Sequence, residues 1–194
     1  MDKFYLIIIT HALNMSIANV KAKLGLDSLK PIAEVSFYNA QSIDKGVCIG
    51  KYDDKILVVS QDRVFGFYEK EASLFEKQIT SLFPDSEIAA LTLYDTVDLY
   101  GYSIIRGGKR VRIKSGADSE VYIDIGNKLK EEDDVLKEVI FSPDEMKEMQ
   151  QKYSSKEVER FVENEVGVRV THALLLKYFD NYEVFDKMQL TEYQ

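Results

Sequence analysis

Three cationic residues alternate with apolar residues in one short stretch of the sequence, and they are its clearest candidates for binding a ligand. Arg110, Arg112 and Lys114 are separated by single residues, so in a β-strand their side chains share one face. Because a planar guanidinium suits carboxylate and phosphate groups, this face is a candidate site for an anion or an acidic peptide. The competing interpretation, which the charge distribution favours, is pairing with acidic residues of the same chain. Candidates for that pairing are Asp118, Glu120 and Asp124.

His11 is a further candidate ligand-binding residue. It directly follows an apolar run, strand ends often gather functional side chains, and imidazole titrates near neutral pH. The alternative interpretation is a hydrogen-bonded residue at the end of a strand. Cys48 lies between Val47 and Ile49, which is typical of a buried thiol. Sequence spacing neither supports nor excludes a thiol–imidazole pair of Cys48 with His11 or His172.

The usual motifs of catalysis and cofactor binding are missing from the sequence. The two histidines and one cysteine lie far apart, with neither a His pair at i, i+4 nor a Cys-x-x-Cys motif, so we expect no metal. Acidic clusters such as residues 131–134 lack the spacing and the glycine of a calcium-binding loop. No glycine-rich phosphate loop joins a strand to a helix, and Gly-x-Ser-x-Gly is absent. We therefore expect no cofactor and assign no catalytic residue.

Composition and charge limit the partners and the location. The chain has 194 residues, 45% hydrophobic and 30% charged, with a net charge of −8. Residues 1–116 carry 15 Lys and Arg against 14 Asp and Glu, whereas residues 117–194 carry 10 against 19. Without a long basic stripe, we expect no binding of nucleic acid. No stretch reaches the roughly 20 apolar residues of a membrane span, and a lone cysteine forms no internal disulfide, so we expect a cytoplasmic protein.

A tight hairpin is predicted to position the cations. Gly107 and Gly108 suit a two-residue turn with positive φ at both positions. Counting outward from the turn places Arg106 opposite Lys109 and Ile104 opposite Val111. This register puts the cations on one face with Gly101 and Ser103, and leaves an apolar face for the core. The predicted apolar face consists of Tyr102, Ile104, Val111 and Ile113.

The remaining pattern predicts an α+β fold with a mainly antiparallel sheet of about five to six strands and packed helices. Residues 4–9 are apolar on both faces and predict a central strand. Ser142-Pro143-Asp144-Glu145 predicts a capped helix to about residue 152. A second helix is expected to start at Ser154 or Ser155 and to end at Gly167, and a third to begin at Thr171. The tail from residue 183 is expected to be poorly ordered except where Val184, Phe185 or Leu190 docks. We divide the chain into an α+β domain, residues 1–141, and a C-terminal helical cap, residues 142–194, packed together as one unit.

A family resemblance rests on three segments. Ile49-Gly50-Lys51-Tyr52, residues 56–60 and the Tyr-Gly-Tyr to Gly-Gly-Lys-Arg-Val-Arg stretch at residues 100–112 resemble a bacterial domain family of unknown function. In that family an aromatic-Gly-aromatic strand precedes a glycine-bearing turn, an arginine and an acidic stretch. The resemblance covers residues 1–135. It implies an α+β fold and brings no catalytic residue.

These observations favour a non-catalytic protein of bacterial type that binds another protein or a small anionic ligand. One alternative is a hydrolase whose site joins His11 and an aspartate to the face carrying Arg110 and Arg112. Another is an acidic adaptor or toxin-neutralising protein that holds a basic partner through residues 117–194.

Overall fold

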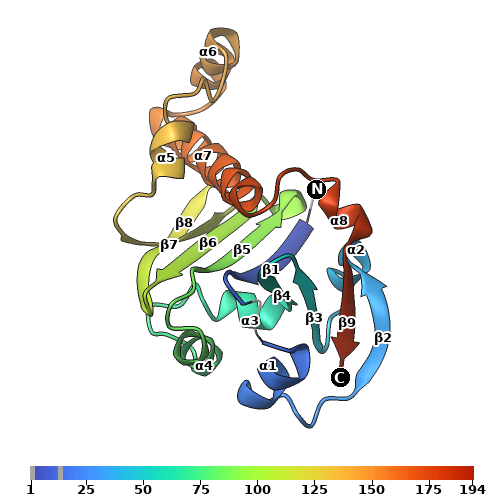
Figure 1. Ribbon diagram of the computed structural model, residues 1–194. Helices are drawn as coiled ribbons and strands as arrows, with labels where there is room; N and C mark the ends of the chain where they lie inside the picture. The colour runs from blue at the N-terminus through green and yellow to red at the C-terminus, as the bar shows by residue number, and fades with distance from the viewer. Residues whose placement is uncertain (1–2, 13–14) are drawn as a thin grey trace.

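A single nine-stranded antiparallel sheet runs through the molecule and carries helices on both faces (Figure 1). The computed structural model describes residues 3–12 and 15–194. The α+β class and the antiparallel sheet are confirmed, but the strands outnumber the five to six expected. In the order β2-β9-β3-β4-β1-β5-β6-β7-β8, they are β2 (Pro31–Ser36), β9 (Gln189–Tyr193), β3 (Val47–Tyr52), β4 (Lys55–Val59), β1 (Lys3–Ile9), β5 (Ile88–Tyr94), β6 (Leu99–Arg106), β7 (Lys109–Ala117) and β8 (Glu120–Gly126).

Strand β1 occupies the centre of the sheet, as its two-sided apolar sequence predicts. It lies between β4 and β5. Phe4, Leu6 and Ile8 pack into one hydrophobic layer, while Tyr5, Ile7 and Ile9 pack into the layer on the other face. Alternation of side chains across a strand explains why a run without polar residues suits only a strand covered on both sides.

Two groups of helices cover the two faces of the sheet. One layer contains α2 (Phe37–Ala40), α5 (Lys130–Val135), the long α7 (Ser155–Tyr178) and α8 (Val184–Lys187). The other contains α1 (Ile17–Lys23), α3 (Gln61–Phe65) and α4 (Leu74–Leu82). A short 3₁₀ turn, Asp95–Val97, joins β5 to β6. Helix α6 (Pro143–Lys152) projects away from the sheet beside the start of α7 (Figure 1). Among the described residues, no helix combines the length and apolar character needed to cross a bilayer.

The β6–β7 hairpin departs from the predicted register after two pairs. Arg106 opposite Lys109 and Ile105 opposite Arg110 are confirmed, but a β-bulge then shifts the pairing, so Ile104 lies opposite Arg112 and Tyr102 opposite Lys114. One extra residue in a strand reverses the faces of all residues that follow it. The prediction that all three cations share an open face is therefore wrong. Arg112 and Lys114 lie on the α7 side, whereas Arg110 lies on the α4 side.

The first C-terminal helix, α6, begins and ends where predicted, whereas the second and third predicted helices form one continuous helix, α7. Ser142 accepts a hydrogen bond from the amide of Glu145 and donates its own amide to the Glu145 carboxylate, which confirms the predicted capping box. Of the two serines proposed to cap the second helix, Ser154 does so, through an equivalent box with Glu157. The expected break at Gly167 is wrong, because α7 continues through it to Tyr178. Thr171 caps no new helix; its hydroxyl donates to the carbonyl oxygen of Gly167, 2.9 Å away.

The tail from residue 183 is more ordered than expected, since Phe185 and Leu190 dock in the core as predicted but the flanking residues also form a helix and a strand. Residues Val184–Lys187 form α8, and Gln189–Tyr193 form β9, which pairs with both β2 and β3. Leu190 is buried in the α7 layer of the core. The segment 142–194 is therefore not only a helical cap, since it also supplies an internal strand of the sheet.

Candidate functional site

Arg112 is enclosed between the sheet and α5. Its side chain is 2% exposed, and its Nε and Nη2 donate to the two carboxylate oxygens of Glu132 over 2.8 and 2.7 Å. Its Nη1 donates to Asp124 on β8. Lys114, two residues along β7, donates to Glu163 on α7 and lies 3.6 Å from an Asp124 oxygen. Of the acids proposed as internal partners, Asp124 is confirmed, while Glu132 and Glu163 were missed.

This cluster is stable in its charged form. Burial alone would lower the pKa of Arg112, but hydrogen bonds to Glu132 and Asp124 raise it. Burial alone would raise the pKa of Glu132, but Arg112 and the Leu129 amide lower it. Because Nε, Nη1 and Nη2 all donate to protein acceptors, the cluster serves to hold α5 and β8 to β7 rather than to receive an anion.

Arg110 is engaged on the opposite face. Its Nε and Nη2 donate to the two carboxylate oxygens of the buried Glu76 on α4. Its Nη1 donates to the carbonyl oxygens of Glu69 and Lys70 over 2.6 and 3.1 Å. The guanidinium therefore fastens α4 and the segment before it to the hairpin.

His11 lies at the end of β1, as predicted, but apart from the arginines. It adopts a left-handed conformation with φ of 56°, and its side chain is 78% exposed. Its Nδ1 is 3.2 Å from Oδ2 of Asp54, in the turn between β3 and β4. Hydrogen bonds from Lys55 and then His11 lower the pKa of Asp54. The structure does not bring His11 to Arg110 or Arg112, which are bound to other acids.

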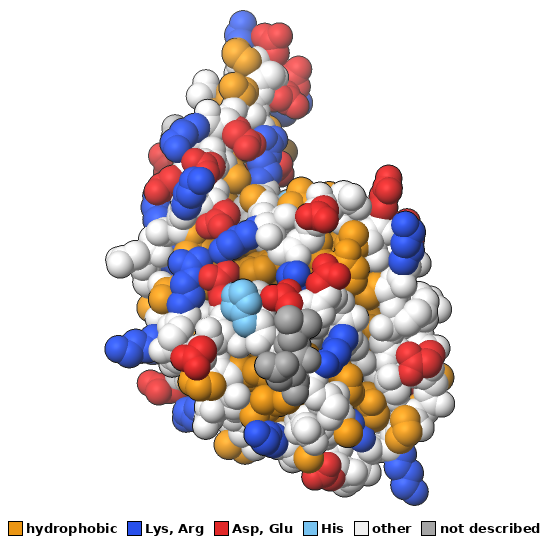
Figure 2. All heavy atoms as spheres, in the orientation of Figure 1, with side chains coloured by type: hydrophobic (Ala, Val, Ile, Leu, Met, Phe, Trp, Pro, Cys, Tyr) orange, Lys and Arg blue, Asp and Glu red, His pale blue; other side chains and the backbone are white. Residues whose placement is uncertain are grey.

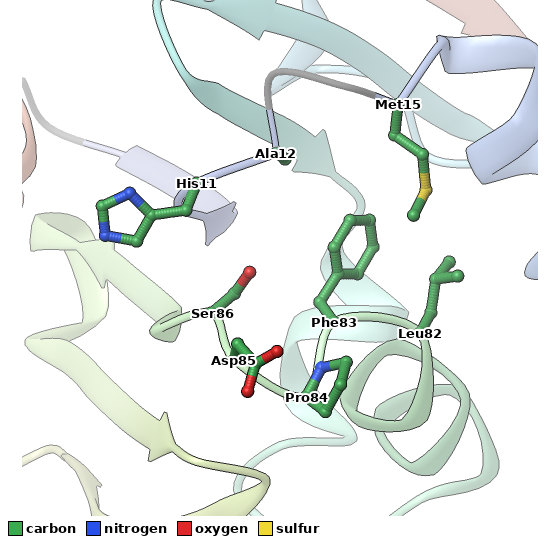
Figure 3. Close-up of a pocket in the computed structure, with 8 residues that line it drawn as sticks. All are labelled: His11, Ala12, Met15, Leu82, Phe83, Pro84, Asp85 and Ser86. Carbon is green, nitrogen blue, oxygen red and sulfur yellow. The ribbon is translucent and has the colours of Figure 1, made fainter.

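A small hollow of about 230 Å³ adjoins His11 (Figure 3). Phe83 and Leu82 form its apolar wall, and Asp85 and Ser86 lie beside it. The imidazole of His11 points away from Phe83 and Leu82 in Figure 3. Pockets for small molecules usually exceed about 300 Å³ and hold polar groups that converge on the ligand. This hollow is smaller than that, and His11 does not point toward its apolar wall.

The other two residues considered for thiol–imidazole chemistry are held in structural contacts. Cys48 is buried, and burial, followed by the charge of Glu192, raises the pKa of its thiol to about 12. Since the thiolate is the nucleophile, this thiol is unreactive near neutral pH. His172 Nδ1 lies 2.7 Å from the hydroxyl of Tyr182, and burial lowers the pKa of its imidazole.

The most prominent surface feature was missed at the sequence level. We call residues 143–165, which comprise α6 and the first part of α7, the arm. Helix α6 buries none of its side chains. Figure 1 shows α6 projecting beyond the sheet, and Figure 2 shows charged side chains crowded over this part of the molecule. The first part of α7 lies against β7 and β8 through Glu163 and Arg160.

Two hollows flank one line of carboxylates on the arm. Glu159 and Glu163 are four residues apart and therefore share a side of α7; we call them the acidic ridge. Toward α6, a hollow of about 620 Å³ is lined by Met146, Val158 and Val162 together with the ridge. Toward the edge strand β8, a hollow of about 550 Å³ is lined by Glu120, Val121, Lys156, Arg160 and the same ridge. The i, i+4 spacing of the two glutamates was the available signal in the sequence.

No protein-family model, curated protein or solved structure matches this chain. The inference of function therefore depends on the geometry described above.

Proposed function

We propose that this is a non-catalytic binding protein whose arm holds a basic, amphipathic segment of another protein. The observation that carries the proposal is the acidic ridge, Glu159 and Glu163, set between two hollows of about 550 and 620 Å³. Helix α6 forms one wall while burying none of its own residues. Because a helix with no buried face adds little to a core, its packing against α7 suits a surface that receives a partner.

Charge favours a basic partner over an acidic one. Residues 117–194 hold 19 Asp and Glu against 10 Lys and Arg. Arg112 and Lys114 neutralise part of this charge through Asp124, Glu132 and Glu163. Glu159, in contrast, makes no ion pair with any described residue. It remains available to a lysine or arginine of the partner, and the surrounding field accelerates encounter.

The hollow toward α6 explains why the segment would be amphipathic. Met146, Val158 and Val162 give it an apolar lining directly beside the ridge. Methionine adapts its shape to different apolar side chains. A segment with an apolar residue next to its cations satisfies both surfaces at once.

Contacts elsewhere support the absence of catalysis and the cytoplasmic location in this proposal. The thiol of Cys48 is protonated, and the imidazole of His11 points away from the apolar wall of its hollow. Neither side chain is therefore arranged for nucleophilic attack. A single buried cysteine also suits a reducing compartment.

Site-specific crosslinking tests the proposal. We would place a photo-crosslinking amino acid at Gln150, which lines the hollow toward α6, and at the exposed Lys23 on α1 as a control. We expect a discrete adduct with a protein that contains a basic amphipathic segment from position 150 only. Adducts of equal yield and identity from both positions would contradict the proposal.

Charge reversal then tests the ridge with the purified complex. Glu159→Lys should weaken binding about tenfold or more, because a favourable charge pair becomes a repulsive one. The matched control is Asp27→Lys, which reverses an exposed acid on the other side of the sheet and should change affinity by less than about twofold. Affinity that is unchanged by Glu159→Lys, or that does not fall with added salt, would count against the ridge.

A further inference from the structure

A second hollow, separate from the arm, lies between α4 and the turn of the β6–β7 hairpin. Its volume is about 570 Å³, within the usual range of small-molecule sites. Four cationic side chains line it: Lys70, Lys77, Lys109 and Arg110. Glu76 is the one acidic residue of its lining. In a protein with a net charge of −8, this is a local concentration of positive charge.

The positive charge of this basic hollow is not cancelled internally. Glu76 and Arg110 neutralise each other through their paired hydrogen bonds. Lys70, Lys77 and Lys109 make no ion pair with any described residue. Three unpaired ammonium groups therefore remain around one concave surface.

The kind of anion follows from which donors are free. The planar fork of Arg110 is occupied by Glu76 and by two carbonyl oxygens, so it is not available to clamp a carboxylate. Ammonium groups act as point charges and suit the compact, doubly charged phosphate. Thr80 and Ser81 also line the hollow and add hydroxyl donors.

The shape of the hollow is fixed by the groups beneath it. Arg110 ties β7 to α4 and to the backbone of residues 69 and 70. The buried Ile105 supplies an apolar floor. At the turn, Gly108 has φ of 71° and carries no side chain. A Cβ added at Gly108 would have the methyl carbon of Thr80 as its nearest neighbour, 3.8 Å away. The mouth thus stays open beside the cations.

We infer that the basic hollow binds a small organic molecule that carries a phosphate group. The phosphate lies among Lys70, Lys77 and Lys109, and the organic part contacts the floor at Ile105. Since α4 and the arm lie on opposite faces of the sheet, this site is independent of the proposed protein partner.

Titration with pyrophosphate and adenosine monophosphate tests this inference. We expect saturable chemical-shift changes at the amides of Gly108, Thr80 and Ser81, with affinity that falls as salt is added. The double variant Lys77→Ala/Lys109→Ala should bind both probes about tenfold more weakly, since each lost ion pair with a doubly charged group costs roughly threefold.

The control removes the same charge elsewhere. Lys23→Ala/Lys45→Ala replaces two exposed lysines outside the hollow and should keep the affinity within about twofold. All the substituted lysines are exposed, and thermal unfolding verifies that both variants fold. An equal loss of affinity in the two double variants would show a general charge effect and overturn the site. Absence of saturation with both probes in the millimolar range would overturn it too. Citrate binding as tightly as pyrophosphate would overturn the phosphate class.

Discussion

The burial of Arg112 shows how much a single side chain depends on its neighbours. Its charge is removed from water, which is costly, and the cost is offset by hydrogen bonds to Glu132 and Asp124. Glu132 also accepts a hydrogen bond from the Leu129 amide at the start of α5. One guanidinium thus fixes the start of a helix and the edge strand at the same time.

Replacing Arg112 with leucine should destabilise the protein by about 3–5 kcal/mol, because Glu132 would be left buried without its counterion. Urea denaturation measures the change in the free energy of unfolding. Lys130→Ala, at a side chain 86% exposed, is the control and should cost less than about 0.5 kcal/mol. The double variant Arg112→Leu/Glu132→Leu should recover part of the loss. A loss below about 1 kcal/mol in Arg112→Leu would contradict the structural account of this cluster.

At the scale of elements, α7 crosses the sheet with a glycine at its closest approach. A Cβ at Gly167 would lie 2.3 Å from Cε2 of Tyr100, so only glycine lets the helix backbone meet this ring. Glycine inside a helix costs roughly 1 kcal/mol relative to alanine. Contact between α7 and the aromatic ring of β6 offsets that cost.

Gly167→Ala should therefore destabilise the protein by about 1–3 kcal/mol, although alanine is the better helix former. Thermal and urea unfolding provide the measurement. In a double-mutant cycle with Tyr100→Ala, the cost of Gly167→Ala should largely disappear, because the ring that blocks the added methyl group is gone. Additive costs in that cycle would mean that the two residues do not meet.

Several elements could be predicted from local sequence alone. The apolar run of β1, the capping box at Ser142 and a helix cap at Ser154 or Ser155 are such local signals, and all were confirmed, the last at Ser154. The bulge in β7 was not predictable, because the alternation of Arg110, Arg112 and Lys114 fits a regular strand equally well. In the sequence, Gly167 resembles the end of a helix. The structure shows that a glycine is needed there because the ring of Tyr100, 67 positions earlier in the chain, packs against the helix backbone.

The candidate site was less predictable than the fold. Sequence spacing identified Arg110 as a surface cation but gave no indication of Glu76, which lies 34 residues away. The i, i+4 spacing of the acidic ridge can be read from the sequence, but the basic hollow and the two hollows beside the ridge combine elements that only the three-dimensional packing brings together. Contacts of this long range depend on the whole topology rather than on local patterns.

At the scale of the whole molecule, Glu87 joins three elements in one contact. It precedes β5 and accepts hydrogen bonds from Arg106 of β6 and from Lys177 and Tyr178 of α7. Burial alone would raise the pKa of its carboxyl, but hydrogen bonds from Tyr178, Lys177 and Arg106 lower it from 4.5 to about 2. The ionised carboxylate therefore stabilises the folded state.

Stability should consequently decline in acid. The contribution of Glu87 is fully present above its ordinary pKa of 4.5 and is lost as the pH falls toward about 2, with an upper limit of about 3 kcal/mol. Urea denaturation across this pH interval measures it. Glu87→Gln should lower stability at neutral pH and give a flatter acid dependence. If the free energy of unfolding falls with pH equally steeply in the parent protein and in Glu87→Gln, the acid sensitivity belongs to other carboxylates.

The place of β9 in the sheet affects how the protein is made. Among the strands that the structure describes, β2 pairs with β9 alone, and the hydroxyl of Thr191 donates a hydrogen bond to the carboxylate of Glu34, 157 positions earlier. While the ribosome is still translating the intervening residues, β2 has no strand to pair with. Because β9 lies between β2 and β3, this side of the sheet can form only after residue 193 has left the exit tunnel. Its formation is then slow, since pairing β2 with β9 closes a long loop. During synthesis the nascent chain therefore exposes the unpaired edge of β3. A chaperone, or a strand of another copy of the chain, would bind at this edge first.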